Sequence, residues 1–293
     1  MAVWRFDAIG TRWEIVSKDE LGAGDRSAVT TIVERFDRTW SRFRADSDVS
    51  RLAADAGPLE SPDAVPMLDA YLQLSAATDG AVNPLVGGSL DALGYDAGYS
   101  LVAGPPIAAP VDWFHRLQWS AGRVTLDAPA VIDVGALGKG RLVDLVFEVL
   151  AAVDGDLVVD AGGDLRVRGG TIRVGLEHPY DATKAIGVTA LQNAALGASA
   201  INRRAWGNGL HHVLDARTGE PVRTWAATWT IAPDAMSADA AATALFFEGG
   251  PRLAASWGVE WVRMATDGRV ERSAGCPAEL FTSRARLRPV PPK

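Results

Sequence analysis

Two oxygen-bearing side chains four positions apart, Asp239 and Thr243, lie in the alanine-rich stretch MSADAAATALF (236–246). On a helix, residues at this spacing project from the same face. A carboxylate and a hydroxyl placed in this way can bind one hard cation, and the alanines leave room beside them. The competing interpretation is a capped helix, with Ser237 as the N-cap and Asp239 in the first turn. Spacing alone favours the capped helix.

A glycine-rich turn between an expected strand and an expected helix is a second candidate site. It lies in VIDVGALGKGRLVD (131–144), where Asp133 precedes the turn and Lys139 lies within it. Such a junction points backbone N–H groups and the positive end of a helix dipole at the turn, which commonly binds phosphate. The turn does not match the P-loop pattern, because Arg141 stands where that pattern has a hydroxyl. On this segment alone, a tight turn that leads into a core helix is the favoured interpretation.

A histidine pair precedes a polar turn in HHVLDARTGEP (211–221). His212 can act as a general base, or it can be a histidine whose hydrogen bonds are satisfied within a hairpin. The run from Asp215 to Gly219 is also typical of an ordinary β-turn with side-chain caps. If the pair lies on a strand, His211 and His212 point to opposite faces and do not bind one metal together.

Composition limits the class of protein. The 293 residues are 48% hydrophobic and 22% charged, which is typical of a globular protein with a large core. The net charge of −7 makes a nucleic-acid surface unexpected. An acidic protein that binds a phosphate ester needs local cations, which lysine, arginine or a metal can supply. With a single cysteine, Cys276, an intrachain disulfide and a cysteine-based zinc site are excluded.

The beginning of the sequence, MAVWRFDAIGTRWEIV, has no basic region followed by an apolar run, and no cysteine that could carry a lipid. No apolar run approaches the length of a membrane span. These observations predict a cytoplasmic protein without a membrane anchor.

Hydrophobic periodicity predicts a mixture of helices and strands without strict alternation. We therefore expect an α+β fold of mixed, largely antiparallel sheets with flanking helices, formed by one large domain over residues 1–283. Residues 284–293 form a basic, proline-rich tail that is expected to be extended. The expected helices cover residues 25–44, 63–78, 141–153, 237–247 and 251–257, and a hairpin is expected at 117–126.

Seven stretches in order resemble the ApbE family of FAD:protein FMN transferases. The resemblance extends from Ile9 to about Gly249, which is most of the chain, and its strength lies in the order of the stretches. They are IGT (9–11), SRFRADSDVSRL (41–52), GAVNPLVGGSLDALGYD (80–96), VIDVGALGKGRLVD (131–144), VVDAGGDL (158–165), HHVLDARTGEP (211–221) and APDAMSADAAATALF (232–246).

The resemblance implies an ApbE-like fold related to the T-fold, and a chemistry. Members bind FAD with Mg²⁺ at its diphosphate, move the FMN half onto a Thr or Ser of an acceptor protein and release AMP. By motif, His212 has a general acid/base role toward the acceptor hydroxyl. The implied metal ligands are Asp239, Thr243 and the backbone oxygen of Ala136. The implied flavin and nucleotide contacts are Ile9, Phe43, Ala81, Val82, Asn83, Asp133, Lys139 and the strand around Leu214.

Three departures from the family pattern bear on this expectation. Gly138 replaces the usual alanine of the central turn, and Asn83 stands where an aspartate often precedes the proline. The export signal of many members is also not seen, so a cytosolic acceptor is expected. Three alternatives remain open: hydrolysis of FAD to FMN and AMP, binding of FAD without catalysis, and a scaffold that keeps only the fold.

Overall fold

The structure is a computed structural model that describes residues 1–281 and 287–289. The chain divides into two compact units, each formed by segments that are separated in the sequence. Unit 1 comprises Met1–Val33, Leu137–Arg203 and Arg223–Lys293, and unit 2 comprises Glu34–Ala136 and Arg204–Val222. Each unit has its own sheets and its own buried apolar residues.

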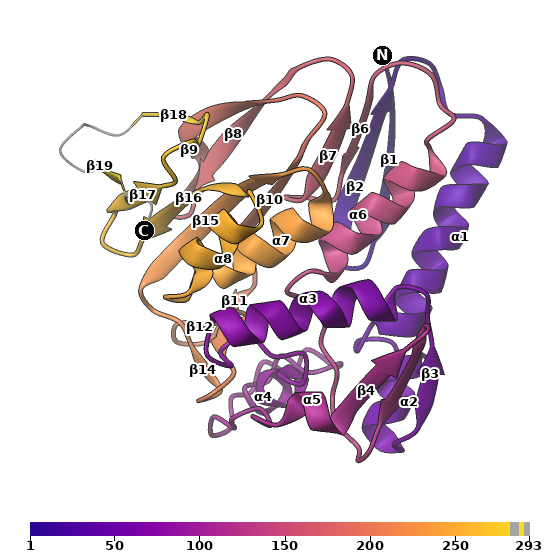
Figure 1. The fold of residues 1–293 in the computed structure, drawn as a ribbon, viewed down its shortest axis with the longest axis vertical. Helices are drawn as coiled ribbons and strands as arrows, with labels where there is room; N and C mark the ends of the chain where they lie inside the picture. Colours follow the sequence, from indigo (N-terminus) through magenta and orange to yellow (C-terminus); the bar gives the residue numbers. More distant parts are fainter. Residues whose placement is uncertain (282–286, 290–293) are drawn as a thin grey trace. The chain divides into compact units, whose positions relative to one another are not determined.

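A nine-stranded sheet forms the centre of unit 1 (Figure 1). Its strands pair antiparallel except β17 and β19, which are parallel. The first hairpin turns at Ile9 and Gly10, which both have positive φ. In order across the sheet, the strands are β1 (Ala2–Ala8), β2 (Thr11–Ser17), β6 (Leu157–Asp160), β7 (Leu165–Arg168), β10 (Ala195–Ala200), β15 (Trp225–Ala232), β16 (Glu260–Ala265), β17 (Val270–Arg272) and β19 (Leu287–Pro289).

Helices cover one face of this sheet (Figure 1). One of them packs unusually close because small residues meet at the contact: a Cβ on Gly197 would lie 2.6 Å from the carbonyl carbon of Ala238. The hydroxyl of Thr230 donates to the Ala238 oxygen over 2.7 Å, which fixes the helix against the strand. The helices are α6 (Gly138–Val149), α7 (Ala235–Ala244) and α8 (Gly250–Ser256).

A second, three-stranded sheet belongs to the same unit and pairs in the order β18–β9–β8. Side chains alternate across a strand, so Thr230 faces α7 while its neighbour Trp229 joins a different apolar cluster. That cluster contains residues of both sheets, among them Leu176, Ile186 and Val262. Helices therefore pack on one face of the large sheet and the small sheet packs on the other. Its strands are β8 (Ile172–His178), β9 (Asp181–Leu191) and β18 (Glu279–Leu280).

Unit 2 is built from helices, a three-stranded sheet and two short strand pairs. Helix α3 buries Met67, Leu68, Tyr71 and Leu74, whose spacing defines one helical face. Its elements are the end of α1 (Ala23–Trp40), α2 (Asp48–Ala54), α3 (Ala64–Ala77), α4 (Gly87–Ala92), α5 (Trp113–Arg116), the sheet of β3 (Pro58–Glu60), β5 (Arg123–Leu126) and β4 (Leu117–Ser120), and the pairs β11 (Ala205–Trp206) with β12 (Leu210–His211) and β13 (Leu214–Asp215) with β14 (Glu220–Pro221).

The predicted fold class is confirmed: helices flank sheets that are largely antiparallel. All five expected helices are present within a few residues of their expected ends, and the hairpin is β4–β5. No helix among the described residues is long and apolar enough to cross a bilayer. The domain boundary expected at residue 283 falls in 282–286, outside the described residues. Of the tail, only Leu287–Pro289 is described, and it is a strand.

Two local expectations are wrong. The strand expected before Asp133 does not form, since the Asp133 N–H donates to the Pro84 oxygen (2.8 Å) and joins no sheet. Ser237 is not the N-cap of α7. That position belongs to Asp234, whose carboxylate accepts from the Ser237 N–H over 2.8 Å, so the helix begins earlier than the sequence indicated.

Candidate functional site

The predicted oxygen pair lies on α7 of unit 1. Asp239 and Thr243 are four residues apart on this helix, so they share a face. Asp239 is only 5% exposed, and its Oδ2 accepts a hydrogen bond of 2.9 Å from the backbone N–H of Gly140. Gly140 lies in the first turn of α6, so the Asp239 carboxylate binds an N–H at the positive end of that helix. This contact fixes the orientation of the carboxylate.

Glycine is required at position 140 by this contact. A Cβ there would lie 2.2 Å from the Ala235 oxygen and 2.8 Å from the Asp239 Cβ, both of which belong to α7. The glycine turn read from the sequence therefore lets α7 approach α6. The N–H that was expected to face a phosphate donates to a protein carboxylate instead.

The donor set suits a hard cation. Asp239 and Thr243 offer oxygen atoms, the ligands that Mg²⁺ prefers. Within residues 1–281, no group of three or more His, Cys, Asp or Glu side chains could hold a metal by itself. Because Mg²⁺ is commonly bound by one or two carboxylates together with substrate phosphates, a single carboxylate fits that mode. Ala136 precedes α6 by two residues but belongs to unit 2, so its backbone oxygen as a third ligand stays a prediction.

Lys139 of the glycine turn forms an ion pair with Asp164, whose side chain is fully buried. Asp164 Oδ1 also accepts from the Ala198 N–H over 3.3 Å. The turn that contains Asp164 adjoins the β1–β2 turn, because a Cβ on Gly162 would lie 2.4 Å from the Thr11 hydroxyl. Two of the expected nucleotide contacts, Ile9 and Lys139, therefore lie at the same end of the strands of the large sheet.

In unit 2, Asp133 is held by three neighbours. Its Oδ2 accepts from Arg42 Nε (2.6 Å), its Oδ1 accepts from the Gly135 N–H (2.7 Å), and its backbone oxygen accepts from the Tyr71 hydroxyl (3.0 Å). Arg42 also binds Asp91 and the backbone oxygen of Tyr95. Two carboxylates and a carbonyl therefore compensate the charge of this buried arginine.

An aromatic cluster surrounds this arginine, and no spacing in the sequence indicated it. The Arg42 guanidinium lies 4.2 Å from the ring centre of Phe43. Phe43 stacks on Tyr99 at 5.0 Å, and Tyr95 stacks on Trp206 at 5.3 Å. Leu214 packs in the same apolar cluster as Tyr95 and Trp206. Two expected flavin contacts, Phe43 and Leu214, are thus brought together from positions far apart in the sequence.

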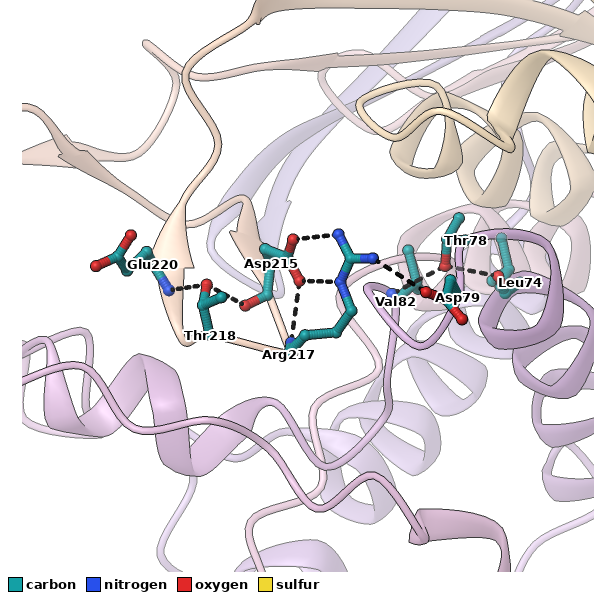
Figure 2. A network of polar contacts seen from close by, with 8 residues as sticks. All are labelled: Leu74, Thr78, Asp79, Val82, Asp215, Arg217, Thr218 and Glu220. Atoms are coloured by element: carbon teal, nitrogen blue, oxygen red, sulfur yellow. Dashed lines mark hydrogen bonds and ion pairs between the residues drawn. The ribbon is translucent and has the colours of Figure 1, made fainter.

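The loop that carries the expected contacts Ala81, Val82 and Asn83 is fixed from both sides. The Thr78 hydroxyl accepts from the Val82 N–H (3.1 Å) and donates to the Leu74 oxygen (2.8 Å) (Figure 2). The Asn83 side chain bridges the Leu85 N–H and the Pro110 oxygen. On the other side, the N–H of Ala216 donates to the Ala81 oxygen over 3.0 Å.

The turn after the histidine pair is the ordinary β-turn that one interpretation expected. Asp215 accepts from the guanidinium of Arg217 through both carboxylate oxygens (2.9 and 2.6 Å) and from the Arg217 N–H (3.0 Å) (Figure 2). Arg217 reaches Asp79 at 3.5 Å as well. These polar residues therefore join the turn to the loop after α3.

The two histidines differ in their surroundings. His211 is buried, with Nε2 2.8 Å from the Val222 oxygen and Nδ1 accepting from the Val213 N–H. His212 Nδ1 is buried as well, but it has no hydrogen-bond partner among the described residues. Burial, together with the positive charge of Arg204, lowers the pKa of His212 to about 3. His212 is therefore neutral near pH 7, the form that can accept a proton.

We expect the His212 ring to stay neutral from pH 8 to about pH 4, since its pKa lies far below the ordinary value of 6.5. The unfolded chain would take up the proton in this range, so the contribution of His212 to stability is complete above pH 6.5 and is lost as the pH falls toward 3. NMR titration of the ring protons measures this, and the His212→Asn variant assigns the signal. A His212 midpoint near pH 6.5 would contradict the prediction.

Fold and site together define the class of protein. It is an α+β protein with a carboxylate–hydroxyl pair suited to a divalent cation, and with an aromatic cluster and a neutral histidine whose Nδ1 is buried in unit 2. The chain belongs to the ApbE family, whose model matches residues 9–262.

Two relatives share about a quarter of their aligned residues with this chain. A protein named FAD:protein FMN transferase from Rhodobacter capsulatus is 27% identical over 292 residues, which cover 89% of this chain and 55% of that protein. The chain therefore spans just over half the length of this relative. A protein of the same name from Haemophilus influenzae is 26% identical over 250 residues, which cover 75% of this chain and 71% of that protein.

Solved structures share the fold. The crystal structure of an ApbE protein from Thermotoga maritima matches with a TM-score of 0.80 at 23% identity, over 93% of this chain and 97% of that one. The flavin transferase ApbE from Vibrio cholerae matches with a TM-score of 0.75 at 19% identity, over 93% and 97%. The α+β architecture described above is therefore that of the ApbE proteins.

Proposed function

We propose that this protein is an enzyme that transfers the FMN half of FAD onto a threonine or serine hydroxyl of an acceptor protein and releases AMP. Family membership and the names of the relatives support the reaction class. The observation that carries the proposal for this chain is the position of Asp239, held at the start of α6 by Gly140 and one helical turn from Thr243.

The cofactor in this proposal is Mg²⁺, held by Asp239, Thr243 and the backbone oxygen of Ala136. When bound, the ion neutralises charge on the diphosphate and on the phosphoryl group being transferred. This answers how a chain of net charge −7 holds an anionic substrate. The single carboxylate leaves coordination positions for phosphate oxygens, which fits a cation that binds together with its substrate.

The FAD contacts in the proposal are the residues that the resemblance to the family implies. In unit 1, Lys139 has three N–H donors, so it can keep its ion pair with Asp164 and also donate to a phosphate oxygen. Ile9 lies at the same end of the strands of the large sheet. In unit 2, Phe43 belongs to the aromatic cluster that would pack against the flavin. The remaining contacts are Ala81, Val82, Asn83, Asp133 and Leu214.

The chemical step is a displacement at phosphorus. The acceptor hydroxyl oxygen forms a bond to the phosphorus of the FMN half, while the bond from that phosphorus to the bridging oxygen breaks and AMP leaves with this oxygen. The hydroxyl proton passes to His212, which is neutral near pH 7, the protonation state that a general base requires. The proposal includes a cytoplasmic acceptor, which carries an exposed threonine or serine.

The test is incubation of the protein with FAD, Mg²⁺ and a candidate acceptor protein. We expect flavin fluorescence on the acceptor band in a denaturing gel and one AMP released for each flavin attached. Replacing the acceptor threonine or serine by alanine is the control and should remove the band. Free FMN with AMP would instead indicate hydrolysis, intact FAD would indicate binding without catalysis, and failure to bind FAD would leave only a scaffold.

A further inference from the structure

Helix α6 carries a buried carboxylate, Asp144, whose contacts the proposed reaction does not use. Asp144 is 3% exposed, and it accepts hydrogen bonds of 2.9 Å from the backbone N–H groups of both Ala235 and Met236. These two residues open α7, so Asp144 binds the N-terminal N–H groups of the neighbouring helix. Arg166 of β7 completes the set with a contact of 2.8 Å.

The contacts between α6 and α7 are reciprocal. Asp144 of α6 binds the start of α7, and Asp239 of α7 binds the Gly140 N–H at the start of α6. Gly140 and Asp144 are four residues apart on one helix, as are Ala235 and Asp239 on the other. Each pair therefore lies on one helical face, and each helix N-terminus receives the carboxylate of the other.

This reciprocity fixes the position of α7 along α6. A shift of α7 by one residue would remove the Asp144 contacts and the Asp239 contact together. The helices also pack closely here, because a Cβ at position 140 would lie 2.2 Å from the Ala235 oxygen. Two backbone donors and the Arg166 guanidinium compensate the desolvation of the buried Asp144 carboxylate. Such a buried carboxylate is unnecessary for a simple apolar helix contact.

We propose that Asp144 is a positioning residue, which acts through α7 to hold Asp239 and Thr243 where they bind the cation. The proposal rests on the cation site of the proposed function. It assigns to Asp144 an effect on cation affinity that is separable from its effect on stability.

The chain offers a matched control for this separation. Asp234 is the N-cap of the same helix, and among the described residues its carboxylate accepts hydrogen bonds from the N–H and the hydroxyl of Ser237 (2.8 and 3.0 Å) and makes none to α6. Asp234→Ala therefore weakens the start of α7 without removing its attachment to α6. Asp144→Asn removes the charge and leaves one carbonyl oxygen for two backbone donors, while it preserves the size of the side chain.

The experiment titrates Mn²⁺ into the full-length protein with ADP as a non-reacting diphosphate, and reads bound Mn²⁺ by electron paramagnetic resonance. We expect Asp144→Asn to raise the Mn²⁺ Kd about tenfold and Asp234→Ala to change it less than twofold, although both lower the melting temperature. Amide hydrogen exchange in α7 without metal should also accelerate in Asp144→Asn. If that variant fails to fold, Arg166→Gln, which keeps both backbone contacts, should raise the Kd by about threefold.

Each outcome decides the proposal. Equal Mn²⁺ affinities for wild type and Asp144→Asn, or equal shifts for Asp144→Asn and Asp234→Ala, would overturn the positioning role and leave the proposed function standing. If Asp144→Asn does not fold, an unchanged Kd in Arg166→Gln overturns the role in the same way. Failure of the wild-type protein to bind Mn²⁺ with ADP would overturn the cation site itself, and this inference with it.

Discussion

Replacing Asp239 by asparagine is expected to lower the rate of flavin transfer by on the order of 10³-fold at fixed Mg²⁺. Asparagine keeps a carbonyl oxygen that can accept from the Gly140 N–H, so the contact between α6 and α7 can survive. What is lost is the negative charge that binds the cation, and a divalent ion contributes several kcal/mol to phosphoryl-group chemistry. Transfer measured over a range of Mg²⁺ concentrations should show a raised requirement.

Two variants on the same helix control for this result. Thr243→Val removes the hydroxyl while preserving shape, and we expect a smaller loss of about tenfold because a neutral ligand is removed. Ser237→Ala lies on α7 outside the oxygen pair and should change transfer by less than twofold. Unchanged Mg²⁺ dependence in Asp239→Asn would show that this carboxylate does not bind the cation.

The part of the site that was predictable from sequence is the part that depends on the spacing of residues within one helix or turn. Asp239 and Thr243 share a helical face because four residues make about one turn, and the sequence shows this directly. The glycines of the central turn were also visible. The reason for glycine at position 140 was not visible, because it depends on the close approach of Ala235, which lies 95 positions further along the chain.

Contacts between distant segments could not be read in this way. The partner of Lys139 is Asp164, and the expectation of a phosphate beside Lys139 rested on the turn alone. The aromatic cluster of unit 2 collects Phe43, Tyr95, Tyr99 and Trp206, which no period connects. A short run of β-branched and apolar residues also suggested a strand before Asp133, but the backbone there bonds to Pro84 instead. In each case, contacts between segments far apart in the sequence determined the local structure.

His212→Ala is expected to reduce flavin transfer by about 10²- to 10⁴-fold, the usual contribution of a general base, while FAD still binds. The ring nitrogen Nδ1 is buried and has no partner among the described residues, and the pKa of the ring is lowered to about 3. The lowered pKa keeps the ring neutral near pH 7 but makes the free ring a weak base, so its action as a base depends on the negative charge of bound FAD, which favours the protonated form. Transfer is measured by flavin fluorescence on the acceptor, and FAD affinity by quenching of flavin fluorescence in solution.

The neighbouring histidine separates a chemical role from a packing role. Both nitrogens of His211 have backbone partners, so His211→Asn should lower the melting temperature while the folded fraction keeps its rate of transfer. If His212 only packs, His212→Ala should resemble His211→Asn, with loss of stability but not of rate. If it accepts the hydroxyl proton, added imidazole should restore part of the transfer by His212→Ala, since a diffusible base can take the vacated position. Near wild-type transfer by His212→Ala would exclude the chemical role.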